Sequence, residues 1–75
     1  MEELAKVLGR SIREKRKERG FSQDGFALVA GIDRSYMGRI ERGEVNITVE
    51  KLYRLAAVLS CEPASLLPSV DHFIG

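Results

Sequence analysis

The sequence is poor in the residue types that build catalytic, metal and disulfide sites. It has one cysteine and one histidine, Cys61 and His72, in 75 residues. A lone cysteine excludes an internal disulfide and suits a reducing compartment, so we expect a cytoplasmic protein. A zinc site would need several carboxylates beside these two residues, and GRIERG lacks the lysine and the preceding strand of a phosphate loop. We therefore expect no metal, no cofactor and no enzymatic activity.

Long apolar runs and a strong net charge are also missing. No apolar stretch approaches the roughly 20 residues of a membrane span, and the acidic start MEELAKVL is unlike a signal peptide. The formal net charge of +1 is by itself a weak argument for a polyanionic partner. The charge is unevenly distributed, however, because residues 10–19 hold six basic and two acidic side chains. Residues 46–75 hold two basic and three acidic ones, so the positive end is the N-terminal half.

The apolar pattern predicts short helices, since no stretch alternates as a strand would. Leu4, Leu8 and Ile12 recur at steps of four and define a first helix, which Gly20 ends. The other expected helices begin at a capping residue or a proline: QDGFALVA after Ser22, RSYMGRIER after Asp33, VEKLYRLAAVLS after Thr48, and PASLL from Pro63. The sequence therefore predicts an all-α fold, a compact five-helix bundle forming a single domain over residues 1–75.

The third expected helix has two different faces. Its apolar side is expected to pack on the core and holds Tyr36, Met37 and Ile40. At about 100° per residue, the other side gathers a polar set within an arc of roughly 140°: Arg34, Ser35, Gly38, Arg39 and Arg42. A solvated charged face is one interpretation of this set. Two features favour a binding surface: arginine makes bidentate contacts to guanine or phosphate, and the glycine, which costs about 1 kcal/mol in a helix interior, permits close approach.

Two charged residues interrupt expected apolar faces. The stripe of the first helix, extended by one step of four, lands on Arg16, where another leucine would be expected. Glu41 follows Met37 by four residues, at the edge of the apolar side of its helix. These positions predict a partly buried ion pair joining the first and third helices. The alternative is two unrelated surface residues.

The order FSQDGFALVAG-ID-RSYMGRIERGEVNIT closely resembles the helix-turn-helix of the phage repressor and Cro-like (XRE) DNA-binding family, over about residues 8–67. Within that family it looks most like the small controller proteins of restriction–modification systems. The resemblance implies a lambda-repressor-like fold with the motif at about residues 22–43. Its first helix would be residues 23–30 and its recognition helix residues 34–42. Arg16 and Glu41 also match a buried arginine–glutamate pair of the family.

The resemblance also implies roles for individual residues. Positions that read bases fall on Arg34, Ser35 and Arg39. The expected contacts to the DNA backbone are Gln23, Tyr36, Asn46 and Thr48, together with Arg42 from its place on the helix wheel. For Gln23 a plain helix-starting role stays open, for Tyr36 core packing does, and for Arg13 and Lys17 a solvated face is the alternative to phosphate contact. Gly25 and Gly38 depart from the family pattern and leave the operator sequence open.

A single recognition helix covers few bases, so domains of this kind usually bind inverted repeats as homodimers, with half-sites about 34 Å apart. We expect the dimer surface within residues 60–75, where a short helix is surrounded by apolar side chains: Leu66, Leu67, Val70, Phe73 and Ile74. The alternative is that they cap the core of one chain. The expected function is a DNA-binding transcriptional regulator, with Glu44 or Glu50 as a further hypothesis for contact with RNA polymerase. The competing class is an antitoxin-type adaptor, which should show apolar residues where this chain has arginines.

Overall fold

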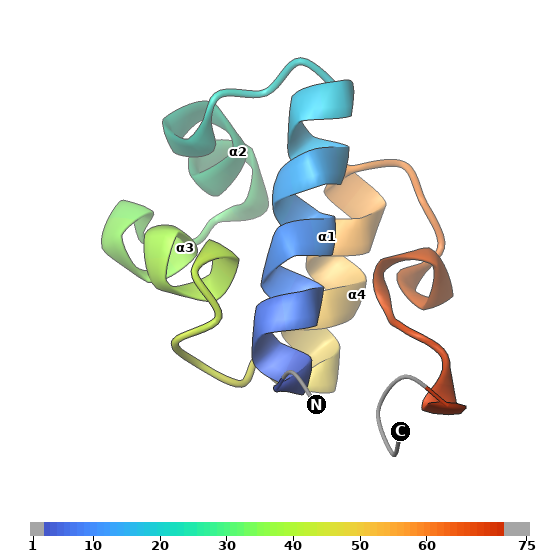
Figure 1. The fold of residues 1–75 in the computed structure, drawn as a ribbon. Coiled ribbons are helices and arrows are strands. Elements are labelled where there is room, and N and C mark those ends of the chain that lie inside the picture. The colour runs from blue at the N-terminus through green and yellow to red at the C-terminus, as the bar shows by residue number, and fades with distance from the viewer. Residues whose placement is uncertain (1–2, 72–75) are drawn as a thin grey trace.

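Four α-helices and one short 3-10 helix begin and end within residues 3–71, the part of the chain that the computed structural model describes (Figure 1). Val70 and Asp71, at the end of this part, are helical as well. They are α1 (Leu4–Glu18), α2 (Gln23–Ala30), α3 (Arg34–Glu41), α4 (Val49–Val58) and the 3-10 helix η1 (Pro63–Leu66). Within these residues there is no strand, so the all-α prediction is confirmed. None of the helices described has the length and apolar character needed to cross a membrane.

Side chains that cap helices set where three of the elements begin. The Ser22 hydroxyl accepts a hydrogen bond from the Gly25 amide at the start of α2 (2.9 Å). Asp33 accepts one from the Tyr36 amide at the start of α3 (3.2 Å), and Thr48 one from the Lys51 amide at the start of α4 (3.1 Å). Each bond satisfies an amide that has no partner within its helix. The predicted starts are therefore confirmed, whereas α4 ends at Val58, two residues before the end of the predicted segment.

The predicted fifth α-helix is wrong, because Pro63–Leu66 forms only a 3-10 helix of four residues. Leu67 follows in an extended conformation, with φ −102° and ψ 145°. It precedes Pro68, and the proline ring disfavours a helical conformation in the residue before it. The segment between the two prolines is thus too short for a further α-helical turn, and the described bundle has four α-helices.

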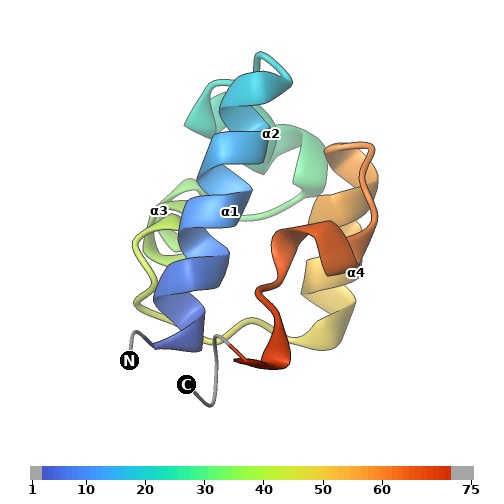
Figure 2. The ribbon, with the colours of Figure 1, turned by 45° about the vertical axis from the view of Figure 1, so that its right-hand side comes forward.

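The core lies between α1, α2, α3 and α4, with η1 closing one side. Figure 1 shows α2 and α3 on one side of the molecule and η1 on the other. Figure 2 brings η1 to the front, where it lies between α1 and α4, and it packs on both. Of the apolar stripe predicted for α1, Ile12 is buried and Leu8 packs partly against the core, whereas Leu4 is 38% exposed. The buried apolar residues are Ile12, Phe26, Ala27, Ala30, Ile32, Met37, Ile40, Leu52, Leu55, Ala56, Leu59 and Leu66.

Two glycines allow α3 to lie close against α1. A Cβ atom at Gly9 would lie 2.5 Å from the carbonyl oxygen of Ile40 and 2.7 Å from that of Glu41. Any side chain at this position would therefore push the two helices apart. Gly43, just after α3, has φ +74° and passes directly over the backbone of Lys6. These contacts fix the position from which α3 presents its outer face.

Candidate nucleic-acid interface

The outward side of α3 forms a polar surface, which we call the arginine face and define as Arg34, Ser35, Gly38, Arg39 and Arg42. Its four side-chain-bearing residues are exposed, whereas Met37 and Ile40 on the opposite side are buried. With Gln23 and Asp24 of α2, the face lines a hollow of about 380 Å³. The structure thus brings the three residues predicted to read bases onto one surface, beside the start of α2.

The predicted ion pair between Arg16 and Glu41 is present in the structure. Arg16 Nε donates to Glu41 Oε2 (2.7 Å) and Arg16 Nη2 donates to Glu41 Oε1 (3.0 Å). Both residues are buried, with 7% and 6% of their surface exposed. The remaining nitrogen, Arg16 Nη1, donates to the carbonyl oxygen of Phe21 (3.0 Å). Each nitrogen of the guanidinium and both carboxylate oxygens therefore have a hydrogen-bond partner. The pair can join α1, α3 and the loop before α2 without leaving an unpaired buried charge.

Gln23 belongs to the same network. Its side-chain amide donates from Nε2 to Glu41 Oε1 (3.1 Å), so the buried carboxylate also fixes the first residue of α2. Gln23 lines two neighbouring hollows, the one at the arginine face and a second of about 440 Å³. The second hollow is lined by Arg13, Arg16, Gln23, Glu41 and Arg42. Gln23 and Arg42 line both hollows and therefore lie between them. Both residues are predicted to contact the DNA backbone.

Carboxylates accompany each arginine of the arginine face, and sequence reasoning missed this arrangement. Arg42 Nε donates to Glu44 Oε2 (2.7 Å), and Arg39 Nε lies 3.9 Å from Glu44 Oε1. Arg34 Nη1 donates to Asp24 Oδ2 (3.4 Å). The Arg42 guanidinium holds the pKa of Glu44 below its ordinary value, and that carboxylate raises the pKa of Arg42. The sequence does show acidic residues close to these arginines, Asp24 in α2 and Glu44 just after α3. Helix periodicity, however, cannot place the side chain of a loop residue such as Glu44.

Tyr36 packs partly against the core from the apolar side of α3. The ammonium group of Lys51 lies 4.9 Å from the centre of its ring, a cation–π contact that joins α3 to α4. Core packing, the alternative left open by the sequence, is therefore the contact present in the free chain. A backbone contact through Tyr36 stays a prediction.

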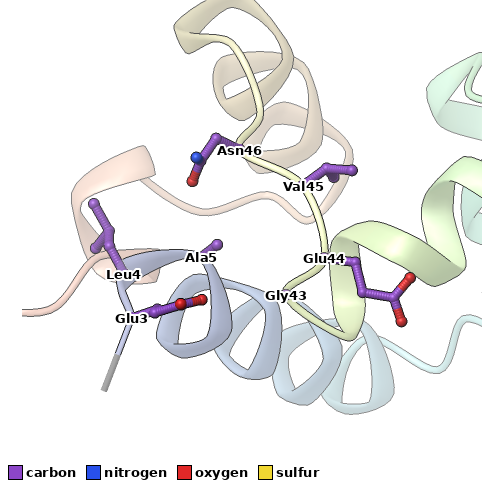
Figure 3. A pocket seen from close by; sticks show the side chains of 7 residues that line it. All are labelled: Glu3, Leu4, Ala5, Gly43, Glu44, Val45 and Asn46. Atoms are coloured by element: carbon purple, nitrogen blue, oxygen red, sulfur yellow. The ribbon is translucent and has the colours of Figure 1, made fainter. Parts of the chain in front are cut away.

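The loop between α3 and α4 carries the remaining expected backbone contacts. Asn46 is exposed, and Thr48 is exposed while its hydroxyl caps α4. Asn46 and Glu44 line a hollow of about 420 Å³ against the start of α1, which also involves Glu3, Leu4, Ala5, Gly43 and Val45 (Figure 3). In that view Glu44 turns away from Leu4 and Asn46, toward α3. The loop thus places an amide on one side and a carboxylate beside the arginine face on the other.

One of the residues predicted to form a dimer surface is instead buried in the core. Leu66 is 1% exposed and belongs to the core, because η1 folds back onto α1 and α4; its assignment to an interface is wrong. Leu67 is 40% exposed and Val70 is 71% exposed. Phe73 and Ile74 lie outside the described residues. For Leu66, the alternative of capping the core of one chain is the correct one.

Among residues 3–71, no group of three or more histidine, cysteine, aspartate or glutamate side chains is placed to hold a metal ion. Cys61 is a half-buried free thiol that packs against the core. His72 lies outside the part of the chain that the structure describes.

Known proteins resemble this chain in sequence and in fold. It is 34% identical over 77 residues to the HTH-type transcriptional regulator SutR of Escherichia coli (strain K12), covering 93% of this chain but only 43% of that protein. It is 32% identical over 65 residues to the control protein C.SmaI of Serratia marcescens, covering 87% of this chain and 77% of the relative.

Solved structures agree with these relatives. The restriction–modification controller protein C.AhdI from Aeromonas hydrophila matches with a TM-score of 0.80 and 38% identity, covering 84% of this chain and 96% of the other. The master regulator for biofilm formation SinR, solved in complex with DNA, matches with a TM-score of 0.75 and 35% identity, covering 79% and 95%. A helix-turn-helix family model matches residues 12–66. The chain therefore belongs to the helix-turn-helix family, in its phage repressor and Cro-like (XRE) branch.

Proposed function

We propose that this protein is a sequence-specific DNA-binding transcriptional regulator whose recognition helix is α3. One observation carries the proposal: α3 buries its apolar side in the core and presents arginine, serine and glycine outward, beside the N-terminus of α2. A helix fits the major groove of B-DNA, where arginine donates two hydrogen bonds to guanine. Relatives of the same family that are named as transcriptional regulators support it, as does the likeness to SinR solved with DNA.

In this proposal Arg34, Ser35 and Arg39 contact base edges. The proposed phosphate contacts come from residues beside these three: Gln23 at the start of α2, Arg42 at the end of α3, and Asn46 and Thr48 before α4. Phosphate contacts hold the register of the protein on DNA, while base contacts select the sequence. Tyr36 adds its hydroxyl to the phosphate contacts from the edge of the face. No bond is made or broken in such a reaction, and we propose a protein that is not an enzyme.

We further propose that the protein acts as a homodimer on inverted repeats, as one domain over residues 1–75. Its recognition helices would enter successive major grooves about 34 Å apart. The dimer surface is assigned to the exposed apolar residues after η1, Leu67 and Val70, together with Phe73 and Ile74. A cytoplasmic location follows from a role on bacterial-type operators. Contact of RNA polymerase with Glu50, which is exposed at the start of α4, is the corresponding proposal for activation.

A role as a restriction–modification controller is supported by C.SmaI and C.AhdI, which this chain covers over most of their length. The competing function, an antitoxin-type adaptor, would be expected to bind through an apolar surface. The outer side of α3 offers arginines instead, so we favour DNA.

The test is selection of random-sequence duplex DNA by the purified protein, with sequencing of the bound pool at two salt concentrations. We expect enrichment of an inverted repeat with one-turn spacing and binding that weakens steeply with salt. Binding without sequence preference, or no binding, would contradict the proposed function.

A further inference from the structure

Gly38 lies on the outward side of α3 and is nevertheless buried. A Cβ atom at this position would lie 3.0 Å from Arg42 Nη1 and 3.7 Å from Gln23 Oε1. The guanidinium group of Arg42 therefore lies across Gly38 and covers the backbone of the recognition helix. In the free protein, the space that the glycine leaves open is therefore occupied by the side chain of the residue that follows α3.

Glu44 holds Arg42 in this position. The two side chains share hydrogen bonds from Arg42 Nε to Glu44 Oε2 (2.7 Å) and from Arg42 Nη2 to Glu44 Oε1 (3.4 Å). The same carboxylate lies 3.9 Å from Arg39 Nε. One acidic residue of the loop thus offsets charge on two arginines of the arginine face.

We propose that Glu44 is an autoinhibitory residue of the arginine face, which we call the Glu44 latch. In the free protein the latch keeps Arg42 over Gly38 and offsets part of the charge of Arg39. DNA must displace Glu44 before Arg42 reaches a phosphate and before a base edge reaches Gly38. This inference rests on the proposed function, because only a DNA-binding surface needs these groups to be released.

The chemistry of the exchange favours a latch that opens. A DNA phosphate is an anion like the Glu44 carboxylate, so it can take its place on Arg42. Exposed ion pairs contribute little to stability, so the latch does not lock the face. While it is closed, however, it lowers the positive charge that DNA meets and the number of counterions released on binding. The latch therefore lowers the affinity of each arginine face for DNA of any sequence.

The first test compares E44Q with E62Q on random-sequence duplex and on the selected operator. Both variants remove one negative charge, but Glu62 is exposed and directly precedes η1. This element lies on the other side of the molecule from α3 (Figure 1). We expect E44Q to tighten binding to both duplexes by about 3–10-fold at 50 mM salt and to steepen the salt dependence by about one unit of log K per log salt. E62Q is expected to change affinity by less than about twofold. Equal effects of the two variants, or weaker binding by E44Q, would overturn the latch.

The second test is a double-mutant cycle with R42A. In the wild type, where Glu44 already occupies Arg42, R42A is expected to weaken DNA binding by less than about twofold. In the E44Q background the same change should weaken it about fivefold or more, because Arg42 is then free to bind phosphate. An equal effect of R42A in both backgrounds would overturn the inference.

The latch can also be observed without DNA, by NMR of the Arg42 side chain in the free protein. We expect slow exchange of the Arg42 Nε–H proton in the wild type and in E62Q, and fast exchange in E44Q. Slow exchange that persists in E44Q would overturn the latch, whatever the protein binds. If the exchange behaves as expected but no variant binds duplex DNA, the proposed function fails and the inhibitory role of Glu44 fails with it. Selective DNA binding with equal effects of E44Q and E62Q overturns the latch alone.

Discussion

Arg39 is the residue of the arginine face best placed to act alone on a base. It lies on the outer side of α3, and its Nε is 3.9 Å from Glu44 Oε1, whereas Arg42 Nε is held 2.7 Å from Glu44 Oε2. A guanidinium that is exposed and only loosely paired can turn its donor fork toward guanine at little cost.

We expect R39A to weaken operator binding by about 1–3 kcal/mol and to relax preference at one operator position. The measurement is affinity for the selected operator and for a set of single-base variants of it. R54A is the matched control, because it removes an exposed arginine of α4 that pairs with Glu50. A uniform loss across all operator variants would instead identify Arg39 as a phosphate contact.

At the scale of residues, the sequence correctly predicted the side-chain contact that depends on helix periodicity. Arg16 and Glu41 were placed correctly, because each follows an apolar stripe by one step of four. The partners of the exposed arginines were not predicted. Glu44 reaches Arg42 only because Gly43 turns the chain with φ +74°, and Asp24 reaches Arg34 only because α2 packs on α3. Both contacts depend on how separate segments meet.

The Arg16–Glu41 pair acts at the scale of elements, since it joins α1 to α3 and, through Gln23, to α2. Removing the arginine would leave a buried carboxylate with Gln23 as its remaining donor. We expect R16M to lower the free energy of unfolding by about 3–5 kcal/mol, as is usual when one partner of a buried pair is lost.

Denaturant unfolding followed by circular dichroism measures this effect. K15M is the control, because Lys15 is only half-buried and pairs at 3.4 Å with Glu18, which is exposed. That variant should lose less than about 1 kcal/mol. Similar losses in the two variants would contradict a special role for the buried pair.

Two glycines within helices should respond to alanine with opposite signs. G9A is expected to destabilise by about 1–3 kcal/mol, since its methyl group would meet the backbone oxygens of Ile40 and Glu41. G38A meets only the flexible ends of Arg42 and Gln23, so the helix propensity of alanine should stabilise it by up to about 1 kcal/mol. Thermal unfolding of both variants is the measurement. Destabilisation by G38A equal to that by G9A would mean that the recognition helix is packed as tightly as the α1–α3 contact.

Element starts were predictable from the sequence because capping is local chemistry, and Ser22, Asp33 and Thr48 each cap as expected. The type and length of the last helix were not predictable in this way. PASLL has apolar residues and a proline start, but Pro68 forces Leu67 to be extended and leaves only a 3-10 turn. The same turn directs Leu66 into the core, which a wheel drawn on an assumed α-helix cannot predict.

For the whole molecule, burial of Leu66 leaves a smaller apolar surface for dimerisation than the sequence suggested. Val70 is the most exposed described residue of this surface, at 71%. It follows η1, the element on the side of the molecule away from α3. A surface so placed would let two chains join while both arginine faces remain open to DNA. Since each face is partly neutralised by its own carboxylates, we expect operator binding to depend strongly on joining two of them.

We therefore expect V70D to shift the protein from dimer to monomer, because a buried unpaired carboxylate disfavours an apolar interface. Loss of the dimer should weaken operator binding at least tenfold at low protein concentration. Sedimentation equilibrium and operator titration are the measurements. V29D is the control, because Val29 is exposed on α2, and α2 lies on the other side of the molecule from η1. This variant should leave the sedimentation unchanged. Thermal unfolding should be near that of the wild type for both variants, which separates loss of the interface from loss of the fold. A V70D protein that sediments as the wild type would place the dimer surface elsewhere, and a wild type that is monomeric on its operator would contradict the two-fold binding mode itself.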